Sequence, residues 1–261
     1  MATPIIDDST ASDLLFPAGF GRGLVPRDYT VQPLKMRAVQ MPTIPRSEWS
    51  ARIKEQKATK SRLSDVWRNA GLKFLDQGPV GYCWTHGPAH AMMAVRAVQN
   101  QPAVSLSAFA VAATIKGGVD EGAWGALALQ FMTERGIPEQ KYWPQGSRNL
   151  AHGTAECWAN AAKYKAGEQW ADVAAPAWDR DLSFDQVATC LLTGQPVVGD
   201  FMWWGHCVCL LDLVEVEPGS FGVYIVNSWK GWGDDIGGAV LRGSQAIPDN
   251  AVSLSTTVTG Q

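Results

Sequence analysis

Residues 76–84 read D-Q-G-P-V-G-Y-C-W and precede an apolar pattern of helical period that runs to about Val98. The two glycines allow a tight turn, so the chain can deliver Cys83 to the first turn of that helix. Unpaired backbone N–H groups and the positive end of the helix dipole meet there, and both favour a thiolate over a thiol. Because the thiolate is the form that attacks carbonyl carbon, this stretch predicts a nucleophile at Cys83.

A histidine stands at the start of a strand-like stretch, where residues 205–211 read G-H-C-V-C-L-L. Side chains alternate along a strand, so His206 faces one side while Cys207 and Cys209 face the other. The two cysteines invite a metal hypothesis, but zinc sites typically use cysteines two to four residues apart. We therefore interpret them as buried core thiols and predict no metal here.

An asparagine closes the next apolar stretch, where residues 223–233 read V-Y-I-V-N-S-W-K-G-W-G. Asn227 can accept a histidine N–H and hold the ring, and Trp229 can shield that hydrogen bond from water. Upstream of the nucleophile, Gln77 carries a side-chain amide that can donate to an oxyanion beside the sulfur. The residue types thus predict a nucleophile, a base, an orienting residue and an oxyanion donor.

Two kinds of periodicity divide the chain. Helical spacing predicts helices at residues 47–68, 83–98 and 126–134, with Ser105 or Ser107 as a cap for a further helix. Runs rich in Val, Leu and Cys, bounded by Gly, Pro and Asp, predict strands at residues 196–199, 206–216, 221–226 and 238–241. A helical half followed by a strand-rich half predicts an α+β protein with its site between two lobes.

Taken in order, these motifs resemble the papain family of cysteine peptidases. L-S-A-F-A-V at residues 106–111 and A-L-Q-F-M-T-E-R-G-I-P-E-Q-K-Y-W-P at residues 128–144 resemble further segments of that family. The resemblance covers roughly residues 65–243. It implies a peptidase domain over residues 46–261, with a helical lobe at about 65–150, a β-rich lobe at about 165–245 and the cleft between them.

Carried over position by position, the resemblance assigns the site. It implies acyl transfer on a peptide or protein substrate, with no metal and no cofactor. The implied catalytic residues are Cys83, His206 and Asn227, with Gln77 in the oxyanion hole. The implied substrate-groove residues are Gly122, Trp124 and Trp229.

The sequence also departs from that family. Val80 stands where the family usually has a cysteine bridged to the groove wall, the wall itself reads Gly122-Ala123, and residues 199–204 replace a much longer excursion. No long helical propeptide precedes the nucleophile, so the compact bacterial and viral relatives are the better match. These departures leave substrate-backbone contact at the wall open.

Composition excludes several classes of function. Hydrophobic residues make up 46% of the 261 residues and the formal net charge is −3, which predicts a globular protein that binds neither nucleic acid nor membrane. Five cysteines, an odd number without regular spacing, favour a reducing, cytoplasmic compartment. The first residues do not form a signal peptide.

Residues 1–45 show neither helical nor strand period and predict an extended or partly disordered arm. Such an arm suggests an alternative function, a structural component of a larger assembly such as a virus particle, whether or not the site is active. Two smaller questions also stay open at this point. His86 and His90 have the spacing of metal-binding histidines on a helix, but a packing role is the preferred interpretation. For Trp203 and Trp204, the sequence does not decide between lining the substrate groove and packing between the lobes.

Overall fold

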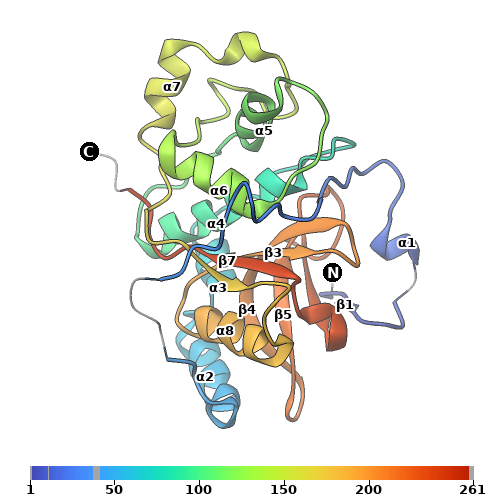
Figure 1. The fold of residues 1–261 in the computed structure, drawn as a ribbon. Coiled ribbons are helices and arrows are strands. Elements are labelled where there is room, and N and C mark those ends of the chain that lie inside the picture. Colours follow the sequence, from blue (N-terminus) through green and yellow to red (C-terminus); the bar gives the residue numbers. More distant parts are fainter. Residues whose placement is uncertain (1, 11, 38–41, 259–261) are drawn as a thin grey trace.

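Two lobes make up the computed structural model, which describes residues 2–10, 12–37 and 42–258. The upper lobe in Figure 1 is helical and the lower lobe is built on a twisted sheet. The helices of the upper lobe and the interface are α3 (Leu63–Asn69), α4 (Cys83–Val98), α5 (Ala108–Lys116), α6 (Gly125–Glu134) and α7 (Ala155–Ala161). Against the sheet lie α2 (Arg46–Thr59) and α8 (Arg180–Leu192), and α1 (Ser12–Leu15) lies in the arm.

The sheet has seven strands in the order β1-β6-β5-β4-β3-β7-β2. Their bounds are β1 Ile5–Ile6, β2 Ala171–Ala174, β3 Val197–Phe201, β4 His206–Glu217, β5 Ser220–Val226, β6 Gly238–Arg242 and β7 Asn250–Ser253. Every pairing is antiparallel except that of β1 with β6. Gly205, at φ 62°, closes the short turn from β3 to β4, a conformation that glycine adopts without a steric cost.

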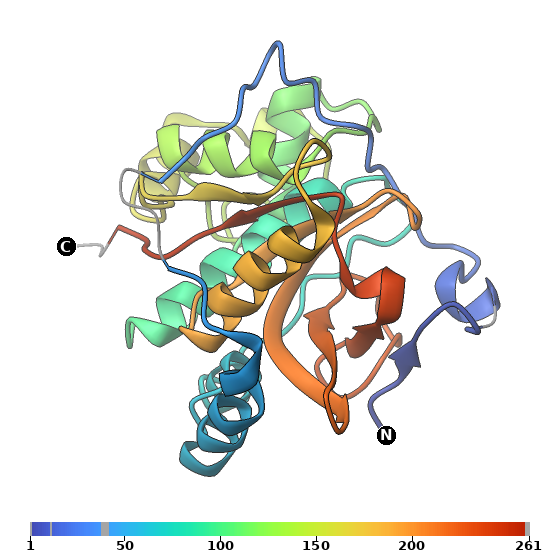
Figure 2. The ribbon, with the colours of Figure 1, turned by 60° about the horizontal axis from the view of Figure 1, so that its bottom comes forward.

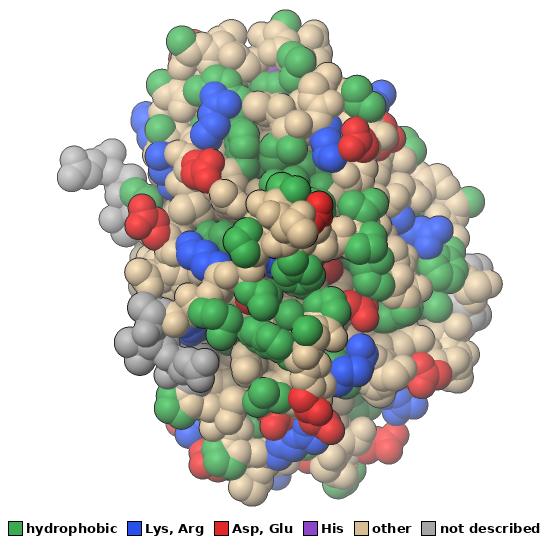
Figure 3. Space-filling model, viewed as in Figure 1, with side chains coloured by type: hydrophobic (Ala, Val, Ile, Leu, Met, Phe, Trp, Pro, Cys, Tyr) green, Lys and Arg blue, Asp and Glu red, His purple; other side chains and the backbone are tan. Residues whose placement is uncertain are grey.

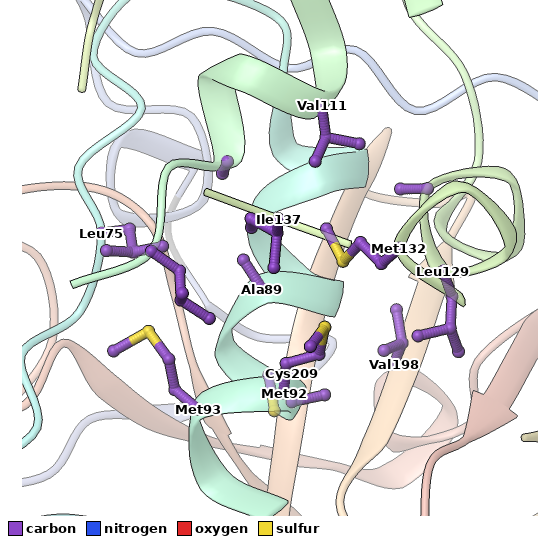
Figure 4. Close-up of a cluster of buried hydrophobic side chains, with 14 of the residues drawn as sticks. Leu75, Ala89, Met92, Met93, Val111, Leu129, Met132, Ile137, Val198 and Cys209 are labelled. Carbon is purple, nitrogen blue, oxygen red and sulfur yellow. The ribbon is translucent and has the colours of Figure 1, made fainter. Parts of the chain in front are cut away.

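Strand β4 is buried on both faces, which explains its continuous apolar run. Cys209 and Leu211 belong to the cluster around α4, whereas Val208 and Leu210 belong to the cluster under α2 and α8. Figure 4 shows side chains of α4, α6 and the strands meeting in the first cluster, with Cys209 next to Met92. The buried thiols of β4 therefore pack as small hydrophobic groups.

The α+β class and the two lobes predicted from the sequence are confirmed, while several element boundaries differ. The single helix expected over residues 47–68 is two helices, α2 and α3, because Lys60 takes a left-handed conformation at the end of α2. Ser107 is the cap of α5 and accepts from the Ala110 N–H at 3.3 Å. The sequence did not predict α7, α8, β2 or β7, which are short or lack a clear period.

The arm differs most from expectation. It contains β1 and α1, and the residues after α1 cross the molecule between the helical lobe and the sheet, as the blue chain in Figures 1 and 2 shows. Leu24 forms an isolated parallel bridge with Ala123 of the helical lobe. Positions 1, 11 and 38–41 of the predicted arm lie outside the described residues.

Candidate active site

His206 and Asn227 meet at the ends of β4 and β5. His206 Nε2 lies 2.7 Å from Asn227 Oδ1, and the same oxygen accepts the Ser228 N–H at 2.7 Å. Because an amide oxygen accepts, this contact fixes the tautomer with the proton on Nε2. His206 Nδ1 is buried and has no hydrogen-bond partner among the described residues. The ring thus keeps one nitrogen available as an acceptor.

Tryptophans enclose this pair. The Trp229 ring stacks on His206 with centroids 4.3 Å apart, and Trp204 meets the imidazole edge-on at 4.8 Å. Trp204 is fully buried and its Nε1 donates to the Leu15 carbonyl of α1 at 2.7 Å. Trp204 therefore packs against both the histidine and the arm, while a role in lining the substrate groove stays a prediction. Trp203 stacks on Trp204 at 5.4 Å.

Cys83 is the first residue of α4, at the end of the tight turn that the sequence predicts. Its side chain is fully buried, and burial raises the pKa of the thiol to about 11. Burial likewise lowers the pKa of His206 to about 3, with the positive charge of Arg22 acting in the same direction. The expectation of a thiolate is therefore wrong for this form of the protein, because lost hydration outweighs the helix N-terminus.

The arm contributes to that burial. The Gly23 N–H points at the Cys83 sulfur, with 3.4 Å between nitrogen and Sγ. On the sheet side, the Leu24 N–H donates to the Gly205 carbonyl at 3.3 Å. On the helical side, Ala123 binds the arm twice, donating to the Gly23 carbonyl at 3.0 Å and accepting from the Val25 N–H at 3.1 Å. Residues 23–25 thus lie between Cys83 and the predicted groove wall.

Gln77 donates to the arm as well. Its Nε2 donates to the Gly21 carbonyl at 2.9 Å and to the Val80 carbonyl at 2.8 Å, while Ser228 Oγ donates to its Oε1. Trp229 Nε1 approaches the same Gly21 oxygen at 3.3 Å. A carbonyl oxygen of the arm therefore accepts from the side-chain amide that the sequence predicts as the oxyanion donor.

The predicted groove wall faces the arm. A Cβ added to Gly122 would lie 2.4 Å from the Gly23 oxygen, so the two backbones approach as closely as glycines allow. Trp124 Nε1 donates to Gln32 Oε1 at 2.5 Å, and this arm glutamine donates in turn to the Ala126 carbonyl at 2.9 Å. All seven site residues predicted from the sequence lie around one cleft, which the arm fills; their catalytic roles stay predictions.

Hydrogen bonds connect the nucleophile loop to the groove wall where the family usually has a disulfide. The Gly81 N–H donates to Asp120 Oδ1 at 2.8 Å, and Tyr82 Oη donates to the Val119 carbonyl at 2.6 Å. All five cysteines are free thiols. Polar contacts therefore hold this part of the cleft without sulfur chemistry.

The histidines of α4 serve packing. His86 Nδ1 contacts the Tyr82 carbonyl at 2.7 Å, and His90 Nε2 accepts the Leu75 N–H at 2.8 Å. No cluster of three or more potential metal ligands occurs within residues 2–10, 12–37 and 42–258. Each ring is thus engaged by its own lobe.

Sequence reasoning missed residues 20–25 and the buried Asp200 as parts of the site. Gly21 and Gly23 are the residues from which a close approach of the arm could have been predicted, because a Cβ at either position would overlap the backbone of residues 79–81. Asp200 lies opposite Cys207 across β3 and β4, and its carboxylate accepts from the Gly125 N–H at 3.3 Å. A lone aspartate in a short strand carries no such signal.

The charge distribution on the surface can be compared with the expectation that the protein does not bind nucleic acid. On the face drawn in Figure 3, acidic and basic side chains are interspersed, without the single-sign field that nucleic acid binding requires. Among the helices of the described residues, none has the length and apolar character needed to cross a bilayer.

Comparison with known proteins identifies the fold. No family model matches the chain, and no curated protein matches it in sequence. The structure is similar to digestive procathepsin L 3 of the Tenebrio molitor larval midgut, at 15% identity and a TM-score of 0.60 over 95% of this chain and 80% of that chain. Xylellain, a cysteine protease from Xylella fastidiosa, matches at 18% identity and a TM-score of 0.54 over 97% and 96% of the two chains. The bromelain protease from Ananas comosus matches at 15% identity and a TM-score of 0.55 over 71% and 95%. The chain has the papain-like cysteine protease fold.

Proposed function

We propose that the protein is a cysteine peptidase in which Cys83 is the nucleophile, His206 the base and Asn227 the residue that orients the histidine. The hydrogen bond of 2.7 Å between His206 Nε2 and Asn227 Oδ1 carries this proposal. This bond leaves His206 Nδ1 as a free hydrogen-bond acceptor. The residue after His206, Cys207, donates its backbone N–H to the Cys83 thiol, so the histidine lies next to the proposed nucleophile in the fold. A base, its orienting group and a nucleophile at a helix start are the parts of a thiol acyl-transfer site.

The reaction divides into two steps. In the first, the Cys83 proton passes to His206 Nδ1, the sulfur bonds to the peptide carbonyl carbon, and the C–N bond breaks as the imidazolium protonates the leaving amine. In the second, His206 takes a proton from water, the resulting hydroxide attacks the thioester, and the carboxylic acid leaves as Cys83 regains its proton.

Gln77 would stabilise the oxyanion of both steps. Its Nε2 already donates to a carbonyl oxygen beside the nucleophile, that of Gly21 in the arm. When that oxygen leaves, the same N–H is free for the oxygen of a substrate. Removal of one such donor typically costs about a hundredfold or more in kcat.

The arm would keep the enzyme inactive in the form described here. Gly23 covers the sulfur, Gly21 takes the oxyanion donor, and burial holds both Cys83 and His206 neutral. Displacement of residues 20–25 would hydrate the pair and bring the two pKa values back toward their ordinary range, where a thiolate–imidazolium pair can form.

The test uses the full-length chain with Gly23→Val, whose side chain cannot fit beside the Gly81 backbone. We expect this variant to turn over fluorogenic peptides in reducing buffer between about pH 5 and 8 and to add a thiol-directed epoxide at Cys83. The same variant with Cys83→Ala serves as the control and should do neither. Absence of both turnover and adduct in a folded Gly23→Val chain would refute the peptidase.

The alternative from the sequence, a structural component of a larger assembly, gains no support from the contacts of the arm. Residues 21–25 and 27–35 bind the cleft and the sheet of their own chain. The reducing, cytoplasmic or virion-associated compartment stays a prediction.

A further inference from the structure

Three polar positions lie in register across the sheet, starting beside the candidate catalytic histidine. Cys207 on β4 pairs with Asp200 on β3, and Asp200 pairs with Asn250 on β7. Directly opposite residues of antiparallel strands project from the same face, and Asn250 Nδ2 donates to Asp200 Oδ2 at 3.1 Å. With strands about 4.8 Å apart, this row ends roughly 10 Å from Cys207.

Asp172 on β2 pairs with Val252, two residues along β7 from Asn250, and so adds a second carboxylate near the end of this row. Its charged partner is Arg27 of the arm, whose Nη1 lies 2.5 Å from Oδ1 and whose Nη2 lies 3.4 Å from Oδ2. The Lys35 backbone N–H, also in the arm, donates to Oδ2 at 2.6 Å. Both side chains of the ion pair are almost fully buried, at 1% and 0% exposed.

Arg27 also reaches the middle of the row. Its Nη1 approaches Asn250 Oδ1 at 3.5 Å, and Tyr29 Oη donates to the same oxygen at 3.0 Å. The arm therefore places a guanidinium and a phenol over a floor of two carboxylates and one amide. We name the residues of this floor, Asp172, Asp200 and Asn250, the acidic floor.

The charges on the two sides of this contact are unequal. The acidic floor contributes two carboxylates, and the described cations that act on them, Arg27 and Lys35, both belong to the arm. Burial raises the pKa of Asp200 to about 6, and the charge of Arg27 opposes that rise. Removal of the arm would thus take both of these cations away from the two buried carboxylates.

Stability alone does not explain such a pair. Burying two charges costs about as much in lost hydration as their attraction returns, so a buried ion pair is weak evidence for stability. The geometry of the pair instead suits the recognition of arginine. A carboxylate that faces two guanidinium nitrogens binds the planar arginine side chain better than it binds the ammonium group of lysine.

We propose that the acidic floor is a recognition site for a basic side chain of the substrate, arginine before lysine, which Arg27 of the arm occupies in the closed form. This inference rests on the proposed peptidase function. Gly23 contacts the Cys83 thiol and Arg27 contacts the acidic floor, and these two arm residues are four positions apart in the sequence. At about 3.3 Å per extended residue, a substrate would therefore present its basic side chain some two to four residues from the bond that is cut.

The experiment uses the full-length chain with Gly23→Val, Arg27→Met and Cys83→Ala, which opens the cleft, empties the floor and prevents turnover. Its probes are peptides identical except at one position, scanned along the peptide, that holds arginine, lysine or citrulline, the neutral analogue of arginine. We expect at least one position at which arginine binds about tenfold or more tighter than citrulline, with lysine in between. Addition of Asp172→Asn or Asp200→Asn should bring that ratio close to one.

Asp249→Asn is the matched control, because Asp249 is an acidic neighbour that bonds Met202 and Arg180 outside the floor. It should leave the ratio unchanged if recognition is local. Equal binding of arginine and citrulline at every position, or an equal loss with Asp249→Asn, would overturn the proposal. If the triple variant does not fold, Arg27→Met with Cys83→Ala carries the same comparison without the added valine.

Turnover separates this inference from the proposed function. Arginine-selective binding by the opened chain, together with absence of turnover when Cys83 is retained, would leave the acidic floor standing and refute the peptidase. Turnover without any arginine preference would support the peptidase and refute the floor.

Discussion

Two neighbouring stretches of the arm are held by different means. Residues 20–25, which we name the plug, are fixed mainly through backbone atoms, such as the Gly23 N–H on Cys83 and the two bonds to Ala123. Two side chains add to this, because Phe20 stacks on Trp229 and Arg22 Nη1 donates to the Trp204 carbonyl at 3.2 Å. Residues 27–35, which we name the anchor, are fixed by buried side chains, above all Arg27 on Asp172.

The plug therefore depends on the fit of its backbone, and the anchor depends on the charge of its side chains. The plug requires glycine, because a Cβ at residue 23 would lie 1.8 Å from the Gly81 oxygen, but it uses few side-chain contacts in the cleft. The anchor depends on the positive charge of Arg27 next to Asp172. Blocking the nucleophile therefore depends on backbone fit, whereas the strength with which the arm is retained depends on charge.

The largest effect should come from forcing the plug out. We expect Gly23→Val to raise the rate of Cys83 alkylation by iodoacetamide about a thousandfold, or roughly 4 kcal/mol, because tightly packed backbone cannot absorb the new methyl groups. Site-resolved mass spectrometry of the full-length chain gives the rate. Gly194→Val, at a turn glycine with φ 74° and no atom within 4 Å, strains the backbone outside the arm and is the control for general destabilisation; it should leave Cys83 protected. Equal rates in the two variants would mean that the plug does not cover the sulfur.

Removal of the anchor charge should have the next largest effect. Arg27→Met leaves the buried Asp172 without its counterion, which we expect to lower the free energy of unfolding by about 3 kcal/mol. Denaturant titration measures the change. In the chain that also carries Asp172→Asn, the loss should be smaller than the sum of the two single losses. Strict additivity would show that the pair is not coupled.

Acid should weaken the closed cleft through His206. Its pKa is about 3 in this form against an ordinary 6.5, so the neutral ring stabilises the fold fully above pH 6.5 and loses that contribution as the pH falls toward 3. Between pH 7 and 5 the loss should reach about 2 kcal/mol, since one pH unit is worth about 1.4 kcal/mol. His206→Gln cannot take up the proton, so the stability difference between wild type and this variant should shrink by that amount. A difference that is constant with pH would contradict the buried neutral histidine.

The smallest effect belongs to the outer end of the anchor. Lys35 Nζ lies 4.3 Å from the centre of the Trp170 ring and donates to the Glu168 carbonyl in an exposed setting. We expect Lys35→Met to cost only about 0.5–1 kcal/mol, as cation–π contacts at exposed sites do. An effect as large as that of Arg27→Met would mean that the anchor is a distributed charge contact rather than one buried pair.

The sequence predicted the scaffold better than the state of the site. Cys83 at a helix start, His206 at a strand start and Asn227 at a strand end follow from local turn chemistry and alternation, and the α+β, papain-like fold is confirmed. The neutral thiol did not follow, because Cys83 is buried by residues some sixty positions away. Asp200 was missed for the same reason, since its partners Asn250 and Gly125 lie on other elements.

The contacts that replace a disulfide beside the nucleophile have a practical consequence. The loop carrying Cys83 is held to the groove wall by Gly81 on Asp120 and Tyr82 on Val119, which a reducing agent cannot break. A thiol enzyme must be stored with excess reductant to protect its sulfur from oxidation, and members with a bridge there risk losing that bridge in the same buffer. The proposed peptidase is free of that conflict, so its purification and assay can use as much reductant as the Cys83 thiol needs.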